Sequence, residues 1–512
     1  MSDINTKNSQ ILAKNTLFLY IRMLLTMLVT LYTSRVILRY LGVDDYGIYN
    51  AVGGIVAMFG VISASLSTAI SRSLTFELGK ENSERLKKMF SCSIMIQLFI
   101  IAVIVLLAET VGLWFLNAKM VIPEDRQVAA NWVYHFSIIT FAISLFSVPY
   151  NASLIAHEQM NIFAYIGILE VVLKLLVVYC LVISPIDRLV LYGFLLMCVA
   201  LIIQAIYFFY CKKHYAECTF SFVRDKTIFK ELFNFATWNF IGSASSIFRS
   251  QGVNILLNIF FGPVVNAARA ISMQVNNAIN GFVGNFMTAL TPQITKAYAQ
   301  GNFSYLLNCI YRGSKFSFFL LFFLSAPVLI ETDYILRLWL VNVPDTTVWF
   351  VRYILIFSLV DTYSRTLINA NNATGDIKMY QIVIGSLNLT VLPVVYVALK
   401  LGASAESTVL VSVFVSLVGL FPRIYFNKKH IPVTYLDFTK KVIVPTIFVG
   451  FVGLTAPYLL YRMLPESFLT FLLVTLVCFI STMVSIFFLG CTRDERNFAL
   501  IYLRKIVKKI KK

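Results

Sequence analysis

Charged residues are scarce in this chain of 512 residues: only 13% are Asp, Glu, Lys or Arg, whereas 59% are hydrophobic. Soluble domains carry about a quarter charged residues, so the composition excludes an ordinary water-soluble enzyme. The eight cysteines form no C-x-x-C pair, which argues against a zinc site or a disulfide framework. Neither a G-x-x-x-x-G-K-[ST] loop nor an H-E-x-x-H motif occurs, so a phosphate-loop ATPase and a zinc protease are excluded as well.

Long apolar runs fill most of the chain. A transmembrane helix needs about 20 such residues, and the runs are continuous rather than alternating, which excludes a β-barrel. The sequence therefore predicts an all-α polytopic membrane protein with about 14 transmembrane helices. The predicted spans are 12–38, 47–78, 89–116, 131–155, 162–183, 189–211, 231–259, 266–295, 306–330, 348–369, 379–399, 403–426, 442–461 and 467–490.

Basic residues determine the expected orientation. The net charge is +18, and most lysines and arginines outside the spans lie in the N-terminus, alternate loops and the C-terminal tail. The positive-inside rule then predicts that both termini lie in the cytoplasm, and it accounts for most of the net charge without any nucleic-acid partner. In the tail, Ile501, Ile506, Val507 and Ile510 can share one face of a basic amphipathic helix on the anionic inner leaflet. The alternative is a disordered basic tail that only sets topology.

A weak internal repeat relates the two halves of the chain. An offset of 220 residues aligns Gly42 with Gly262 and Thr68 with Thr288, and it superimposes the hydropathy of the first helix pair on the seventh and eighth. Two six-helix pseudo-symmetric lobes around a central cavity are expected, which suits alternating access. The predicted organisation is a cytoplasmic N-terminus (1–11), an N-lobe (12–211), a cytoplasmic loop (212–230), a C-lobe (231–426), a second loop (427–441), two further helices (442–490) and the tail (491–512).

Arginines within the predicted spans are the first candidate site residues. A charge at membrane depth is costly unless it faces protein, water or a partner. Guanidinium groups suit phosphate or pyrophosphate, so Arg22 and Arg249 are predicted to bind a pyrophosphate. Arg72 and Arg269 lie nearer to membrane faces, where snorkelling to the surface is the stronger alternative.

Polar residues also recur at helical spacing in two spans. Lipid cannot solvate such faces, so they should line a wet cavity or another helix. Amides and hydroxyls suit ligands rich in hydroxyl groups, such as sugars. The predicted lumen-lining residues are Asn239, Ser243, Ser246, Ser250 and Asn254 in the seventh span, and Asn276 and Asn280 in the eighth.

Two same-helix pairs combine opposite charges four residues apart: Glu170 with Lys174, and Asp361 with Arg365. One interpretation is mutual neutralisation inside the bundle. The other is a carboxylate that exchanges H⁺ or Na⁺ during transport. No resident cofactor or metal is expected beyond such a coupling ion.

Three segments carry a family resemblance. Ile335–Leu340 (ILRLWL), followed by Val343-Pro344, resembles the outer loop before the tenth helix of Wzx-type bacterial polysaccharide flippases. The stretch 372–381 (NATGDIKMYQ) is similar to their next inner loop. The stretches 34–42 (SRVILRYLG) and 46–50 (YGIYN) are similar to their first outer turn.

This resemblance implies membership of the MATE-like MOP exporter superfamily, in a family that moves undecaprenyl-pyrophosphate-linked oligosaccharide to the outer leaflet. The products would be O-antigen, capsule or other surface polysaccharide, including that of lipopolysaccharide. A polysaccharide polymerase and a chain-length regulator are candidate partners. The alternatives are a MATE-type cation-coupled multidrug antiporter, which a carboxylate-rich cavity would favour, and a membrane polymerase or ligase, which needs a longer outer loop.

Overall fold

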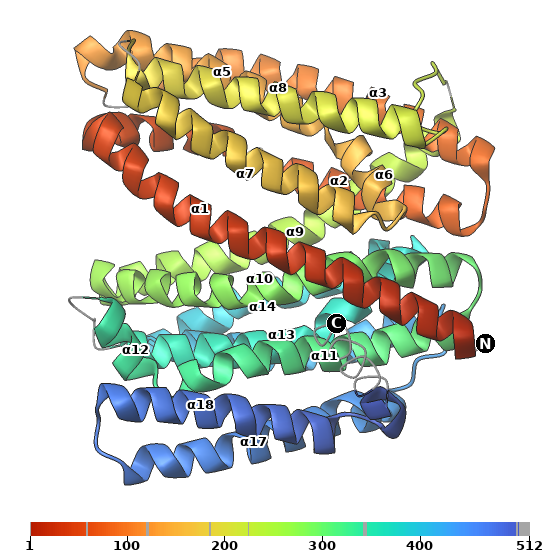
Figure 1. The fold of residues 1–512 in the computed structure, drawn as a ribbon, viewed down its shortest axis with the longest axis vertical. Helices are drawn as coiled ribbons and strands as arrows, with labels where there is room; N and C mark the ends of the chain where they lie inside the picture. The colour runs from red at the N-terminus through yellow and green to blue at the C-terminus, as the bar shows by residue number, and fades with distance from the viewer. Residues whose placement is uncertain are drawn as a thin grey trace, which may run out of the picture. The chain divides into compact units, whose positions relative to one another are not determined.

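Helices are the regular elements of the described chain. The computed structural model describes residues 2–57, 60–118, 122–183, 186–223, 225–340, 346–497 and 500. Within these ranges, fourteen helices have at least 18 residues; each overlaps one predicted span, except that α1 overlaps the first two (Figure 1). They are α1 (Ser2–Ala57), α2 (Gly60–Gly79), α3 (Ser83–Leu107), α5 (Gln127–Phe146), α7 (Met160–Ile183), α8 (Arg188–His214), α9 (Lys226–Phe261), α10 (Pro263–Ala299), α11 (Phe303–Ile330), α13 (Thr347–Thr374), α14 (Lys378–Lys400), α15 (Ser407–Lys428), α17 (Val444–Met463) and α18 (Phe468–Ser485).

Shorter helices complete the described chain: α4 (Leu113–Ala118), α6 (Val148–Ala156), α12 (Thr332–Trp339) and α16 (Tyr435–Phe438). Ten helical stretches of the described residues are long and apolar enough to cross a membrane. The long helices outside that set are α2, α9, α10 and α13, which hold many of the predicted polar positions. The predicted fold class, an all-α polytopic membrane protein, is confirmed.

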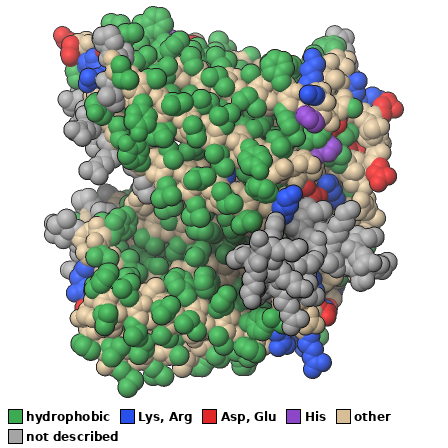
Figure 2. Space-filling view, viewed as in Figure 1, with side chains coloured by type: hydrophobic (Ala, Val, Ile, Leu, Met, Phe, Trp, Pro, Cys, Tyr) green, Lys and Arg blue, Asp and Glu red, His purple; other side chains and the backbone are tan. Residues whose placement is uncertain are grey.

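The surface agrees with this assignment. In Figure 2, hydrophobic side chains cover the flanks of the helices, and Lys, Arg, Asp and Glu gather near the helix ends. Exposed apolar side chains include Phe99, Ile183 and Phe451. Such exposure is compatible with lipid as the solvent and is not typical of a water-soluble monomer.

One predicted boundary is wrong. The sequence placed a turn at residues 39–46, but α1 continues through it to Ala57, and α2 begins only at Gly60. The segment contains Gly42 but no proline, and a single glycine costs a helix only about 1 kcal/mol. Asp45 within this stretch forms an ion pair with Arg126, which anchors the extended helix.

The chain divides into two compact units. Unit 1 comprises Met1–Ala244, Thr288–Asn302 and Asn372–Gln381, and unit 2 comprises Ser245–Met287, Phe303–Asn371 and Ile382–Lys512. Four helices, α9, α10, α13 and α14, therefore contribute residues to both units. The predicted lobes and repeat stay predictions.

In unit 1, α1 lies along α7, and α5 lies along α8 (Figure 1). Tyr134 is fully buried and donates a hydrogen bond to the carbonyl of Ala108 at 2.6 Å, where α3 passes into a π-helical turn (Ala108–Gly112). Phe90 and Tyr150 make an edge contact with ring centroids 5.4 Å apart. Interlocked aromatic and aliphatic side chains of this kind form the core of the unit.

A loop cluster closes one end of unit 1. His157 Nε2 lies 2.6 Å from Glu217 Oε1, and the imidazole stacks on the ring of Tyr215 at 4.1 Å. Burial opposes ionisation of Glu217, but the hydrogen bond and charge of His157 outweigh it and hold the pKa of Glu217 below its usual range. Glu217 is therefore an anion at neutral pH.

In unit 2, α17 and α18 form an antiparallel pair (Figure 1). A π-helical turn (Thr439–Ile443) leads into α17, and another (Ile486–Gly490) follows α18. Lys315 Nζ of α11 lies 2.7 Å from Glu495 Oε2, with both side chains only 5% exposed, and Arg312 Nε lies 3.3 Å from the other carboxylate oxygen. The segment after α18 is thus held to α11 by a buried ion pair. Most of the predicted basic amphipathic tail lies outside the described residues.

Candidate functional site

A polar pocket in unit 2 contains two of the predicted arginines. Arg249 of α9 and Arg269 of α10 line a cavity of 110 Å³. The walls come from α9, α10, α13 and α15, and the described lining residues include no Asp or Glu. They are Arg249, Ser250, Val253, Arg269, Met273, Asn276, Ile354, Phe357, Thr408, Val409 and Ser412.

The spacing of polar residues in α9 explains how Arg269 is held. Ser250 and Asn254 are one helical turn apart, so they share a face. Arg269 Nη1 donates to the carbonyl of Ser250 at 3.2 Å and to Asn254 Oδ1 at 3.3 Å. The guanidinium is thereby fixed beside the pocket, while its remaining N–H groups are available for a ligand in the fork geometry that suits an oxyanion.

Arg249 is held differently. Its guanidinium lies over the ring of Phe357, with the Cζ atom 5.4 Å from the ring centroid. The two arginines line the same cavity, so their charges repel each other. No salt bridge joins Arg249 to a carboxylate of the described residues. The pocket thus has an excess of positive charge that a bound anion would relieve.

A hydrogen-bond network leads away from the pocket. Ser358 Oγ donates to Asn276 Oδ1 at 2.6 Å, and Asn280 Nδ2 donates to the same oxygen at 2.7 Å. Arg365 Nη2 donates to Asn280 Oδ1 at 2.7 Å, and Arg365 Nε lies 3.8 Å from Asp361 Oδ2. Asn276 and Asn280 thus connect the pocket to the predicted Asp361–Arg365 pair.

The other predicted polar residues of α9 lie in different units and do not line the arginine pocket. Asn239 is buried in unit 1 and donates to the carbonyl of Ser65 at 3.4 Å. Ser243 is half-buried in the same unit. Ser246, in unit 2, accepts a hydrogen bond from Asn388 Nδ2 at 3.4 Å. Only the part of the polar face from Arg249 onward reaches the arginine pocket.

Arg22 lies in unit 1, packed against α7. Its guanidinium is 4.4 Å from the ring centroid of Phe163, and a Cβ on Gly167 would lie only 2.3 Å from Arg22 Nε. Gly167 therefore leaves the space that the arginine fills. Because Arg22 and Arg249 belong to different units, a pyrophosphate site shared by them stays a prediction.

Arg72 has internal partners within unit 1. Its side chain is 9% exposed, lies 3.4 Å from Glu231 Oε1, and donates from Nε to the carbonyl of Asn372 at 3.2 Å and from Nη2 to that of Ala373 at 3.0 Å. Glu231 also binds Arg85 Nη2 at 2.9 Å. Arg72 thus holds the end of α13 and the turn after it to α2 and α9, and its predicted role in ligand binding stays a prediction.

The Glu170–Lys174 pair lies on a more open face of α7. Lys174 Nζ is 2.6 Å from Glu170 Oε1, and the two side chains are 49% and 37% exposed. The pair is therefore not enclosed in the core of unit 1. Its predicted role in ion exchange stays open, whereas Asp361 is connected to a polar pocket.

Sequence reasoning missed several contributors to these sites. Phe357, Ser358, Thr408 and Ser412 lie on α13 and α15, where isolated hydroxyl or aromatic residues give no periodic signal. Glu231 was also missed because its partners Arg72 and Arg85 lie about 150 residues away in the sequence. None of these residues forms a nucleophile–base arrangement in the described structure; the arginine pocket is suited to binding an anion.

Comparison with known proteins identifies the family. A family model described as polysaccharide biosynthesis protein matches residues 12–298, more than half of the chain. The uncharacterized membrane protein EpsK of Bacillus subtilis (strain 168) is 20% identical over 289 residues. That match covers 56% of this chain and 56% of EpsK, so it spans little more than half the length of the relative.

Solved structures share the fold at low identity. A MATE structure in complex with MaD3S has a TM-score of 0.69 and 14% identity, covering 83% of this chain and 99% of that one. A multidrug resistance MATE family transporter in an outward-facing conformation, and a MOP superfamily transporter from Pyrococcus furiosus, each have a TM-score of 0.68, 14% identity, and coverage of 82% and 98%. The chain therefore has the fold of the MATE transporters and belongs to the polysaccharide biosynthesis protein family, in agreement with the resemblance to Wzx-type flippases.

Proposed function

We propose that this transporter moves undecaprenyl-pyrophosphate-linked oligosaccharide from the inner to the outer leaflet of the bacterial inner membrane. The observation that carries the proposal is the pocket in which Arg249 and Arg269 lie together without an acidic lining residue among those described. Alternating access would expose this pocket to each side of the membrane in turn.

The chemistry of the pocket matches a pyrophosphate. Two unit charges 4 Å apart interact by about 4 kcal/mol at the effective dielectric constant of a protein near its surface. The attraction of a bound anion to both arginines therefore offsets the repulsion between them. Guanidinium forks bind phosphate oxygens in pairs. A cavity of 110 Å³ has room for a phosphate group, while the attached sugars would occupy a wider lumen and meet Asn and Ser side chains.

Asp361 is our candidate for energy coupling. Its partner Arg365 is hydrogen-bonded through Asn280 to Asn276, which lines the pocket. Anion binding at Arg249 would make the potential at Asp361 more negative and so favour its uptake of H⁺ or Na⁺. Glu170 and Lys174 lack such a connection in the described structure, so they are the weaker candidates.

The cellular setting follows from the same proposal. Both termini would lie in the cytoplasm, where the basic loops and tail meet anionic lipids. The substrate would serve O-antigen, capsule or lipopolysaccharide assembly, with a polymerase and a chain-length regulator acting on the exported unit. A cation-coupled drug antiporter is less well supported, because an organic cation would be repelled by two arginines.

The test replaces the pocket arginines in a strain that depends on this chain for surface polysaccharide. We expect Arg249→Gln and Arg269→Gln to stop export and to accumulate lipid-linked oligosaccharide on the inner leaflet. Arg462→Gln is the matched control, since Arg462 is exposed and donates to Tyr458 Oη at the end of α17, away from the pocket. Membrane abundance of each variant is measured by immunoblot.

Flipping of the purified lipid-linked oligosaccharide in proteoliposomes gives a direct second readout. Export at the wild-type rate by the double variant, at equal abundance, would overturn the proposal. So would wild-type proteoliposomes that fail to flip the lipid-linked substrate but exchange an organic cation for H⁺ or Na⁺.

A further inference from the structure

Two segments from the second half of the sequence are packed into unit 1. They are Thr288–Asn302, from α10 and the turn after it, and Asn372–Gln381, from the end of α13 to the start of α14. Both segments cluster with the first half of the chain rather than with the rest of their own helices. They lie at the end of the bundle that the basic loops predict to face the cytoplasm. Contacts between the two halves of the chain at this end are therefore contacts within unit 1.

Glu158, in the turn between α6 and α7, makes the first of these contacts. Its Oε1 atom is 2.8 Å from Lys296 Nζ of α10, and Gln293 Nε2 donates to Oε2 at 3.4 Å. Asn15 Nδ2 of α1 donates to the carbonyl of Glu158 at 3.0 Å. The φ of Glu158 is +58°, which is uncommon for residues other than glycine. Residues held in such conformations cluster at clamps and switch regions, where the surrounding structure keeps them in place.

Arg72 makes the second contact in the opposite sense. Here a side chain of α2, in the first half of the chain, binds the second half through the carbonyls of Asn372 and Ala373. The turn that follows these carbonyls also has a residue with positive φ, Gly375 at +81°. The α6–α7 turn thus binds the end of α10, and α2 binds the α13–α14 connection. Each half of the chain supplies one turn and one helix.

The ends of α2 and α10 also meet directly. A Cβ built on Gly79 would lie 2.9 Å from the Cβ of Ala299 and 3.1 Å from the Cα of Lys296, so the two helices approach as closely as a glycine allows. Gly79 and Ala299 are separated by 220 residues, which is the offset of the predicted repeat. The turns after the two helices, at Glu81 and Gly301, are related by the same offset, and both residues have positive φ. Equivalent positions of the predicted repeat therefore contact each other, as in an isologous interface.

We propose that these contacts form a reversible latch that closes the cytoplasmic end of the transporter. The latch consists of Glu158 with Gln293 and Lys296, and of Arg72 with the carbonyls of residues 372 and 373. Alternating access requires the two halves of a transporter to separate at one end while they close at the other. Carboxylate, ammonium and carbonyl groups bind water when they separate, so such contacts can open and close repeatedly. The inference goes beyond the proposed function, because it holds for any substrate.

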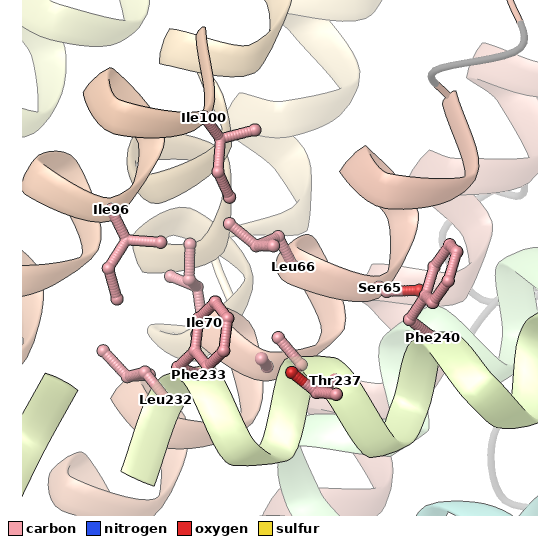
Figure 3. Close-up of a pocket in the computed structure, with 11 residues that line it drawn as sticks. Ser65, Leu66, Ile70, Ile96, Ile100, Leu232, Phe233, Thr237 and Phe240 are labelled. Atoms are coloured by element: carbon pink, nitrogen blue, oxygen red, sulfur yellow. The ribbon is translucent and has the colours of Figure 1, made fainter. Parts of the chain in front are cut away.

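A cavity beside α2 leaves room for this movement. It has a volume of 230 Å³ and lies between α2, α3 and α9 (Figure 3). Leu66 and Ile70 of α2 and Ile96 and Ile100 of α3 point toward the turns of α9 around Phe233 (Figure 3). Close-packed interiors resist displacement, whereas the lining here is almost wholly apolar and incompletely packed. The helix that carries the arginine of the latch can therefore shift into this space when the latch opens.

The experiment measures the distance between the two helix ends in the full chain, reconstituted in phosphatidylcholine nanodiscs. Ketone-bearing amino acids at Lys80 and Gln300 carry nitroxide spin labels, which avoids labelling the eight native cysteines. Both residues are exposed and are not part of the latch. Double electron–electron resonance then gives the distribution of distances. We expect a main population at short distance, in which the latch is closed, and a minor one at longer distance.

Charge variants test the ion pair of the latch. Glu158→Gln and Lys296→Gln should each raise the ratio of long to short distances about fivefold, equivalent to about 1 kcal/mol for a partly exposed ion pair. The charge swap that combines Glu158→Lys with Lys296→Glu should restore the wild-type ratio, which a purely steric role of the two side chains would not. Glu81→Gln is the matched control, because Glu81 is exposed and has nearly the same φ, +57°.

Gly79→Val tests the contact between the helices independently of charge. The added side chain would meet the backbone of α10, so the distribution should shift to the longer distance. Gly60→Val is the control on the same helix, because a Cβ built there has nothing within 4 Å. Membrane abundance of each variant is measured first, and the charge swap keeps the test decisive if Gly79→Val does not fold.

Two results would overturn the inference. A single distance shared by the wild type, Glu158→Gln and Gly79→Val would make the contacts a permanent brace rather than a latch. A shift in Glu158→Gln that the charge swap does not reverse would mean that the ion pair does not hold the helix ends together. The proposed function is judged separately, because neither result depends on which substrate is carried.

Discussion

Gly375 gives a sharp test of how Arg72 holds the end of α13 and the turn after it. Its φ of +81° is one that L-residues rarely adopt, and a Cβ there would lie 2.6 Å from Arg72 Nη2. Gly375→Ala should therefore destabilise the protein in two ways. The left-handed backbone costs about 1–2 kcal/mol for an L-residue. In addition, the displaced guanidinium loses its bonds to the carbonyls of Asn372 and Ala373, and hydrogen bonds to charged groups contribute about 1.5–3 kcal/mol each.

The two costs can be separated experimentally. Gly402 has a similar φ of +88° but nothing within 4 Å of a built Cβ, so Gly402→Ala measures the backbone cost alone. Because a flexible side chain can keep part of its bonding, we expect Gly375→Ala to exceed this control by about 2–4 kcal/mol in free energy of unfolding. The measurement is equilibrium unfolding in mixed detergent micelles, with thermal melting as a second readout.

A double-mutant cycle completes the test. Arg72→Met removes the guanidinium and keeps most of the aliphatic stem, so Gly375→Ala in that background should cost no more than Gly402→Ala. If the cost of Gly375→Ala were the same with and without the guanidinium, the proposed contact would not be the cause.

Two further predictions concern buried carboxylates. Glu495→Gln should lower the free energy of unfolding by about 3–5 kcal/mol because it leaves Lys315 charged and buried. Glu84→Gln, which breaks an exposed ion pair with Lys88, should change the free energy of unfolding little. Similar losses in the two variants would contradict the buried ion pair. Glu217→Gln should lower the melting temperature at pH 7. Because the pKa of Glu217 is lower in the folded protein than in the unfolded chain, its ionised form stabilises the fold above the ordinary glutamate pKa of about 4.3. This stabilisation is lost as the pH falls through the lower pKa of the folded state. The difference in melting temperature between Glu217→Gln and the wild type should therefore shrink below about pH 4. Glu124→Gln, on an exposed residue, is the control and should change the melting temperature little at either pH. A difference for Glu217→Gln that stays constant with pH would refute the assignment.

The helices could be predicted from the sequence because hydropathy is a local property. Each long helix of the described chain overlaps an apolar run, and the positions of Arg249, Ser250 and Asn254 on one side of α9 follow from helical spacing. The pairing of Arg249 with Arg269 was not predicted, because it depends on how α9 and α10 pack. Hydropathy gives the depth of a residue in the membrane but not its rotation toward a neighbouring helix.

Long-range partners were beyond local reasoning. Arg72 binds the carbonyls of Asn372 and Ala373, which lie 300 residues away, and carbonyls leave no signature in the sequence. The continuation of α1 past Gly42 was missed for a related reason. A glycine followed closely by Asp44 and Asp45 resembles a turn until a partner such as Arg126 is known.

The four helices shared by the two units limit how this transporter can move. Four of the five boundaries fall inside helices, including α9 between Ala244 and Ser245 and α10 between Met287 and Thr288; the boundary after Asn302 falls between α10 and α11. Any displacement of one unit against the other must then be absorbed by bending helical backbone. Pro292, five residues beyond the boundary in α10, removes one backbone hydrogen bond and so softens that helix. If bending is concentrated at such points, each of these helices behaves as two rigid segments joined by a hinge. Stiffening a single helical turn there would then slow the transport cycle.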